Sequence, residues 1–292
     1  MNNNNALEIL TSFFFGQSIF LIVNACTSEP QSGGLLTIGV INYDGGGAII
    51  NQYARFQRYL AERTKAKIIL EPTFNENKAI ERLESRAWSL MFAPPGIAAI
   101  AISRYQYIPI FPLIGVTNLR CVLVTREDSP IRTLQDLQGK TVALGQLGSA
   151  TGYYLPLYNL YGLTVAEILS APTPKTVMQW VAEGKAIAGA VSMAEFNLYS
   201  SQFQGTKFRI FYTDPHYVPP GVVLIQPTIE SKRQEYIRKV MSDFPSSSAQ
   251  EVGYIPNAAI PNYKYMISVV ERVQPITSQL QTKPVQLFNK TI

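Results

Sequence analysis

Apolar and polar residues alternate in blocks from residue 35 onward. The segment LLTIGVINY, at residues 35–43, is a continuous apolar run rich in β-branched residues, which is typical of a strand buried on both faces. It is followed by AIINQYARFQRYLAERT, in which Tyr53, Phe56 and Leu60 recur at helical spacing. The two segments predict a buried strand and then an amphipathic helix.

The same alternation continues to the end of the chain. Further strands are predicted at residues 67–73, 89–95, 107–115, 120–127, 141–145, 186–192, 208–214 and 221–227. Helices are predicted at residues 77–87, 96–103, 129–140, 175–185, 194–203, 231–244 and 262–280. Alternation of strand and helix favours an α/β fold whose sheets are mostly parallel and flanked by helices.

The elements fall into two series, which predicts two lobes. Residues 35–115 and 213–292 are assigned to lobe one, and residues 116–212 to lobe two. Each of the two crossings between the lobes lies in or beside a strand-like segment, which would suit a hinge.

The N-terminal segment has features of a targeting signal. Residues 9–23 form an uncharged apolar run, shorter than the about 20 residues of a membrane-spanning helix but suited to a signal peptide. The run ends at VNAC, which resembles the lipobox of bacterial lipoproteins. Residues 1–25 are therefore predicted to be a signal peptide, and residues 26–34 a tether that carries a lipid on Cys26. The lipid would anchor the protein to the membrane, in the periplasm or at the cell surface.

Two features of this segment depart from the lipoprotein pattern. Asn24 is an unusual residue two positions before the cleavage point, and the leader MNNNNALE has no positive charge. An uncleaved membrane anchor helix is the alternative. Both interpretations place the rest of the chain outside the cytoplasm.

The composition of the chain limits the kinds of partner and site that it can have. The 292 residues carry a net charge of +5, but the basic residues are scattered, so no nucleic-acid partner is predicted. The chain has two cysteines without a CxxC pattern and one histidine, His216. The sequence therefore contains few of the residues that a metal site or a Ser/His/Asp triad requires. We predict no catalytic residue, no metal and no cofactor.

Several segments, in this order, carry a resemblance to a known family. They are IGVINYDGG, FPLIGVTNLRCVLVTREDSPIRTLQDLQGKTVALG, GSATGYYLPLYNLYG, VMQWVAEGKAIAGAVS and YTDPHYVPPGVVL. Over nearly all of residues 36–280 the chain resembles the phosphate/phosphite/phosphonate-binding family of bacterial ABC-transporter solute-binding proteins. The resemblance implies a type II periplasmic binding protein fold, whose interlobe cleft closes over an anion that is passed to a membrane permease without any reaction.

The resemblance also implies ligand-binding positions. They are Tyr43 after the first strand, Pro95 in the FAPPG turn, Glu195 as the only nearby downstream acid, and the loop residues Ser149, Ala150, Thr151, Gly152 and Tyr153. In the loop, Ser149 can cap the following helix while successive N–H groups and hydroxyls face an anion. Gly148 and Gly152 permit close approach or a positive φ. A plain helix cap with nothing bound is the alternative.

The chain departs from the family's usual pocket at three places. The loop reads Ser-Ala-Thr-Gly instead of Ser-Thr-Ser-Gly, which removes one hydroxyl. The segment SAPTPKT lacks the family's cleft histidine, leaving Lys175 or Thr176 to compensate, and GKAIAG lacks an acid. These losses put an aminoalkylphosphonate ligand in doubt.

The sequence therefore predicts a monomeric binding lipoprotein, not an enzyme, that captures a phosphorus oxyanion (phosphonate, phosphite or phosphate) for ABC permease subunits. A ligand-sensing accessory protein of the same fold and a binder of another organic anion such as a sulfonate are the alternatives.

Overall fold

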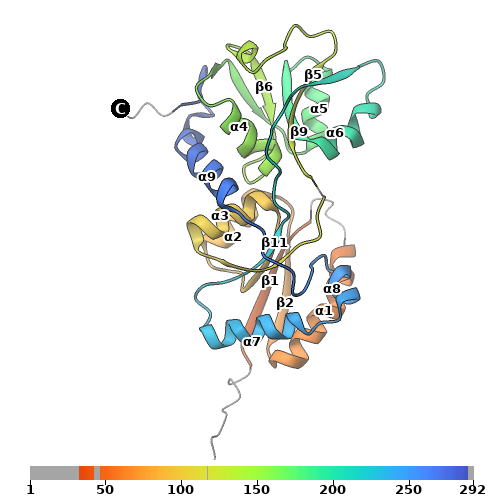
Figure 1. Cartoon of the computed structure of the whole chain (residues 1–292), viewed down its shortest axis with the longest axis vertical. Helices are drawn as coiled ribbons and strands as arrows, with labels where there is room; N and C mark the ends of the chain where they lie inside the picture. Colours follow the sequence, from red (N-terminus) through yellow and green to blue (C-terminus); the bar gives the residue numbers. More distant parts are fainter. Residues whose placement is uncertain (1–32, 43–46, 117, 289–292) are drawn as a thin grey trace, which may run out of the picture. The chain divides into compact units, whose positions relative to one another are not determined.

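The computed structural model describes residues 33–42, 47–116 and 118–288 (Figure 1). The predicted signal peptide and the predicted lipid attachment at Cys26 lie outside the described residues. Among the helices of these ranges, none combines the length and apolar character needed to cross a membrane.

The first sheet has five strands in the order β2-β1-β3-β11-β4. Their bounds are β1 (Leu35–Ile41), β2 (Lys67–Thr73), β3 (Leu90–Ala93), β4 (Ile108–Pro112) and β11 (Val222–Ile225). β1 runs parallel to β2 and β3, whereas β11 is antiparallel to β3 and β4. The prediction of a mostly parallel sheet is confirmed, with one reversed strand.

The second sheet has five strands in the order β10-β5-β9-β6-β8. Their bounds are β5 (Cys121–Arg126), β6 (Thr141–Leu144), β8 (Glu167–Ser170), β9 (Ala188–Ser192) and β10 (Phe208–Thr213). β6 is parallel to β8 and β9, whereas β5 is antiparallel to β9 and β10. The reversed strands β5 and β11 are each the first strand after the chain crosses from one sheet to the other. They run opposite to their neighbours because they lead away from the edge where the crossings lie.

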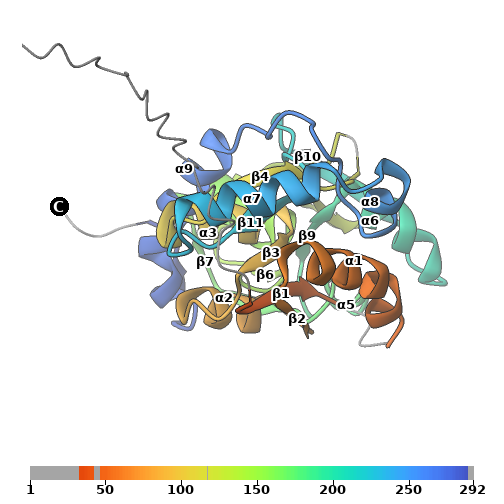
Figure 2. The same cartoon turned by 90° about the horizontal axis from the view of Figure 1, so that it is seen from below.

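Helices cover both faces of the first sheet (Figure 1). Their bounds are α1 (Ala48–Thr64), α2 (Glu76–Glu84), α3 (Pro95–Tyr105), α7 (Ser231–Ser242) and α8 (Ser246–Glu251). α1 contacts α7 and α8 on one face, and α2 contacts α3 on the other (Figure 2). The predicted face of α1 is buried: Phe56 is fully enclosed and its ring lies 5.8 Å from that of Phe92.

The helices of the second sheet are α4 (Leu155–Asn159), α5 (Pro174–Ala182) and α6 (Met193–Tyr199). After them, α9 (Lys264–Val273) contacts both α3 and α4, and β12 (Val285–Gln286) pairs with β7 (Thr164–Val165). The C-terminal segment thus contacts helices that belong to both sheets. The boundaries of the two lobes stay a prediction.

Two local predictions differ from the structure. The segment predicted as a helix at residues 129–140 contains only a 3₁₀ turn, η1 (Gln135–Leu137). The Asp136 carboxylate accepts the backbone N–H groups of Arg132 and Thr133 at 2.7 and 2.8 Å, which offers the backbone an alternative to helical hydrogen bonds. The sequence pattern also predicted no element where β7, β8, α8 and β12 form.

Candidate functional site

A cavity of about 680 Å³ lies where segments from the carboxyl ends of strands in both sheets meet. Ile41 at the end of β1 and Asn42 after it line the cavity from the first sheet, and Gly145 and Gln146 after β6 line it from the second. We call it the polar cavity. Open α/β sheets bind ligands at such strand ends, so this is the leading candidate site.

The starts of five helices face the polar cavity. Ala48 and Ile49 lie at the start of α1, and Glu76 at the start of α2. From the other side come the Ser149 cap, the Thr173 cap of α5 and Glu195 in the first turn of α6. A helix N-terminus presents unpaired N–H groups and the positive end of the helix dipole. No lysine or arginine is among the described residues that line this cavity, so attraction for an anion would have to come from backbone and hydroxyl donors.

Ser149 caps the helical segment that follows it, as predicted. Its Oγ accepts the N–H of Gly152 at 3.0 Å, and its carbonyl accepts the N–H groups of Tyr153 and Tyr154 at 3.2 and 3.0 Å. Within the described residues, no acceptor takes the N–H of Ala150 or of Thr151. These two donors and the Ser149 hydroxyl hydrogen are the hydrogen-bonding capacity left at this helix start.

The first turn after Ser149 is a π-helical turn, η2 (Ala150–Tyr154), which continues into α4. Pro156 explains why a regular helix does not form here, because proline has no N–H to donate to the preceding turn. The carbonyl of Gly152 accepts the N–H of Gly145 at 2.8 Å instead. This bond fixes the loop to the end of β6.

Glycines hold the loop against the first sheet's helices. Gly148 has φ +106° and also approaches its neighbours closely, because an added Cβ would lie 2.5 Å from Cβ of Glu76 and 2.7 Å from Cδ1 of Ile97. A Cβ on Gly96, at the start of α3, would collide with the Gly148 carbonyl oxygen. The loop therefore packs backbone against backbone at the start of α3 and against the side chain of Glu76 at the start of α2.

The structure separates the predicted ligand-binding residues into groups. Ser149, Gly152 and Glu195 line the polar cavity. Ala150 and Thr151 are buried and do not line it. Their roles in binding stay predictions.

The remaining three predicted positions lie elsewhere. Tyr153 faces a separate cavity of about 430 Å³, which Tyr154 and Arg104 also line. Pro95 faces a third, apolar cavity of about 340 Å³. Tyr43 lies outside the described residues. Their roles in binding also stay predictions.

Several residues of the polar cavity were not expected from the sequence. Thr173 accepts the N–H of Thr176 at 3.1 Å and caps α5, so it stands where the family's imidazole was sought. Gln146 has a buried amide oxygen with no partner among the described residues. Gln52 and Tyr199 complete the polar part of the lining. The Thr-Pro helix start was the one signal that could have pointed to Thr173.

Two carboxylates face the same cavity. Glu195 accepts the N–H of Ser192 at 2.7 Å while Ser192 Oγ accepts the N–H of Glu195 at 3.1 Å, which is a capping box. Glu76 is 9% exposed in the first turn of α2. The helix dipoles stabilise both negative charges. The cavity therefore offers N–H donors beside carboxylate acceptors.

The described residues that line this cavity include no histidine and no cysteine. The described residues contain no group of three or more His, Cys, Asp or Glu placed to hold a metal ion. His216 bonds the buried Asp214 carboxylate at 3.1 Å and does not line the polar cavity. Cys121 is fully buried, and burial raises the pKa of its thiol. The arrangement is suited to holding a ligand.

Comparison with known proteins places the fold and the family. The family model described as "ABC transporter, phosphonate, periplasmic substrate-binding protein" matches residues 38–254. None of the curated proteins matches the sequence. The resemblance and the α/β fold predicted from the sequence are both confirmed.

Solved structures of similar fold share little sequence with the chain. XAC2383 from Xanthomonas citri bound to ATP has a TM-score of 0.66 at 19% identity, covering 82% of this chain and 98% of its own. PhnD1 from Prochlorococcus marinus in complex with methylphosphonate has a TM-score of 0.61 at 16% identity, with the same coverage of 82% and 98%. A putative periplasmic sulfonate-binding protein SsuA from Methylobacillus flagellatus has a TM-score of 0.55 at 15% identity, covering 87% and 91%.

Proposed function

Because the chain belongs to the family of periplasmic substrate-binding proteins of phosphonate ABC transporters, we propose that it captures a phosphorus oxyanion in the polar cavity and delivers it to an ABC permease. The family consists of transporter components that bind a ligand, not of enzymes. The observation that carries the proposal is the convergence of five helix starts on one cavity.

The helix starts supply the attraction for an anion. Backbone N–H groups and helix dipoles bind phosphoryl oxygens without a charged side chain. The Ser149 hydroxyl, which lines the polar cavity, is the side-chain donor best placed for this role. Methylphosphonate and ATP, the ligands named for two proteins of similar fold, both carry phosphorus oxyanions, which supports the same class here.

The two carboxylates limit which anions suit the site. Glu76 and Glu195 repel a bare dianion and attract a ligand that also carries a proton donor. A phosphonate with one proton, or one with an amine, meets both requirements. Glu76 therefore makes an aminoalkylphosphonate a candidate ligand again, although the departures from the family's usual pocket had put it in doubt.

A thermal-shift panel tests the ligand class. Phosphate, phosphite, methylphosphonate, aminoethylphosphonate, sulfate and taurine are each added in excess to the protein. A ligand at 100 times its Kd stabilises the folded state by about 2.7 kcal/mol, which raises the melting temperature measurably. At least one phosphorus compound should do so. A shift with sulfate or taurine alone would assign the protein to sulfur oxyanions instead.

A pair of capping variants tests the place of binding. Ser149→Ala and Asn262→Ala each remove a side-chain acceptor at a helix start, because Asn262 accepts the N–H of Lys264 at 2.9 Å at the start of α9, away from the polar cavity. Each should cost about 0.5–2 kcal/mol of stability. Only Ser149→Ala should also weaken methylphosphonate binding, by about tenfold, which is the value of one hydrogen bond to a charged group. Equal affinities for the two variants would mean that Ser149 is a cap and nothing more.

We also propose that the protein acts as a monomer anchored by a lipid on Cys26. The VNAC segment after the apolar run supports the anchor. Mass spectrometry of the mature protein tests it. An intact Met1 or an unmodified Cys26 would rule the lipid out.

A further inference from the structure

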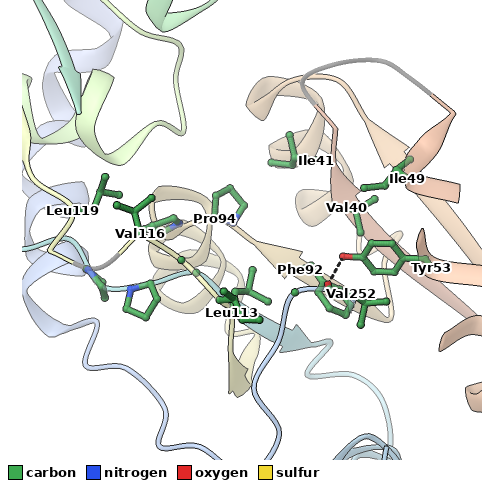
Figure 3. Close-up of a pocket in the computed structure, with 17 residues that line it drawn as sticks. Val40, Ile41, Ile49, Tyr53, Phe92, Pro94, Leu113, Val116, Leu119 and Val252 are labelled. Carbon is green, nitrogen blue, oxygen red and sulfur yellow. Dashed lines mark hydrogen bonds between the residues drawn. The ribbon is translucent and has the colours of Figure 1, made fainter. Parts of the chain in front are cut away.

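The apolar cavity that Pro95 faces lies beside the polar cavity, and its described lining is mostly hydrocarbon. It measures about 340 Å³ and lies at the ends of β1 and β3, under the two segments that cross between the sheets (Figure 3). None of the described residues that line it is charged. Among these residues the polar side-chain atom is the hydroxyl of Tyr53, which donates to the carbonyl of Val252 at 3.0 Å and is thereby satisfied. We call this the apolar cavity.

The apolar cavity has a buried floor and an exposed rim. Val40 and Phe92 are at most 5% exposed and form part of the floor. Ile114 and Val116, on the first crossing segment, remain 50% and 58% exposed. Figure 3 shows Val116 and Leu119 on one side of the cavity and Val40 and Tyr53 on the other. Covering the rim with hydrocarbon would remove apolar surface from water, which is favourable.

The two cavities adjoin each other. Ile41 and Ile49 line both, so a molecule in the polar cavity meets these side chains at the entrance of the apolar one. The helix start that faces the apolar cavity also differs from the other five. It is capped by Pro94 and begins at Pro95, and prolines have no N–H to offer. Donors for an anion are therefore concentrated in one cavity and reduced in its neighbour.

We propose that the ligand is an organic phosphonate or phosphate monoester whose hydrocarbon substituent occupies the apolar cavity. The inference rests on the proposed function, because the phosphorus oxyanion is taken to lie in the polar cavity. The size is adequate: a dry cavity of about 150 Å³ already holds benzene. The substituent passes Ile41 and Ile49 and packs against the floor and rim of the apolar cavity.

A ligand series tests this directly. Methyl-, ethyl-, propyl-, butyl- and phenylphosphonate are titrated into the protein by calorimetry, with 3-aminopropylphosphonate as a polar match for butylphosphonate. Each added methylene should tighten Kd about fourfold, as full burial of a CH₂ predicts. Binding of methylphosphonate without any gain up to butylphosphonate would overturn the apolar subsite and leave the proposed function intact. Binding of none of them would instead overturn the proposed function.

A variant of the exposed rim tests whether the gain in affinity per methylene comes from the apolar cavity. Ile114→Asn combined with Val116→Asn changes two exposed side chains that line only the apolar cavity, so the fold should persist. We expect an unchanged Kd for methylphosphonate and a gain below about twofold per methylene. Ile50→Asn is the control, because Ile50 is 54% exposed and lines neither cavity. It should keep the full gain. A full gain in the double variant would place the substituent elsewhere and overturn the inference.

Discussion

The two faces of the loop between β6 and α4 have different tasks. One face, with Ser149 and Gly152, lines the polar cavity. The other, with Tyr153 and Tyr154, packs into the core and lines a separate cavity. Gly145 lies between them and lines both cavities.

The difference follows from helical geometry. A helical turn points neighbouring residues in different directions, so a run of five consecutive residues cannot face one ligand. We therefore interpret half of the contiguous motif as the proposed binding surface and the other half as an anchor that fixes this surface in place. If this division is right, changes on the two faces should separate affinity from stability.

The largest effect is expected from Gly148→Ala. The φ of +106° costs an alanine about 1–3 kcal/mol, and the collision with Glu76 and Ile97 adds about 1–3 kcal/mol. The loop must move to relieve the collision, so methylphosphonate binding should weaken by about tenfold or more. Urea unfolding and calorimetry measure the two losses.

Gly162→Ala is the matched control for this change. Gly162 has φ +101°, but an added Cβ there meets nothing within 4 Å. It should show the backbone cost without the collision and bind methylphosphonate like the original protein. Similar losses of affinity in both variants would mean that the contact between the loop and the start of α2 does not position the binding face.

The regular parts of the fold were predictable because their signals are local. The sequence pattern placed a helix at residues 48–64 and a strand at residues 67–73, and these are the bounds of α1 and β2. Burial on one face of a long helix leaves a strong period in the sequence. The π-turn of η2 was not predictable, because it depends on the bond between Gly145 and Gly152 as well as on Pro156.

The candidate site was predictable only where one segment carries it. The sequence pointed to Ser149 within a recognisable motif, and the structure finds it at the polar cavity. Gln52, Glu76 and Thr173 reach the same cavity from three other helix starts. Each looks like an ordinary surface or capping residue in its own segment, so only the packing of the two sheets' helices reveals them.

A smaller effect is expected from the charge opposite the loop. Glu195→Gln keeps an amide oxygen that can accept the Ser192 N–H, so the capping box and the fold should persist. Loss of the negative charge removes a repulsion on the order of 1 kcal/mol, so methylphosphonate should bind about fivefold more tightly. Aminoethylphosphonate should bind less tightly, because its amine loses a partner. Calorimetry with both ligands measures the two shifts.

The control for this change is Glu127→Gln, which removes one exposed carboxylate outside the polar cavity. It should leave both affinities unchanged. If Glu195→Gln also leaves both unchanged, the ligand does not approach α6, and the binding surface is restricted to the other helix starts.

The smallest effect on affinity is expected from the core face of the loop. Burial raises the pKa of Tyr153 to about 12, above its ordinary value of 10. Between pH 10 and pH 12 the unfolded chain loses this proton and the folded protein keeps it. The unfolded state then binds fewer protons, so stability falls as the pH rises through this window. Tyr153→Phe removes this contribution, so its stability should fall less steeply than that of the original protein between pH 10 and pH 11.

Urea unfolding at pH 8, 10 and 11 measures that slope, and calorimetry at pH 8 measures methylphosphonate binding. We expect an unchanged Kd and a change in stability below about 1.5 kcal/mol at pH 8, because the substitution nearly conserves volume. Tyr217→Phe is the control, because Tyr217 is 53% exposed and lines none of the three cavities described above, and it should leave the Kd for methylphosphonate unchanged. A loss of affinity in Tyr153→Phe comparable to that of Ser149→Ala would show that the phenol reaches the ligand, and the division of the loop into a binding face and an anchoring face would be wrong.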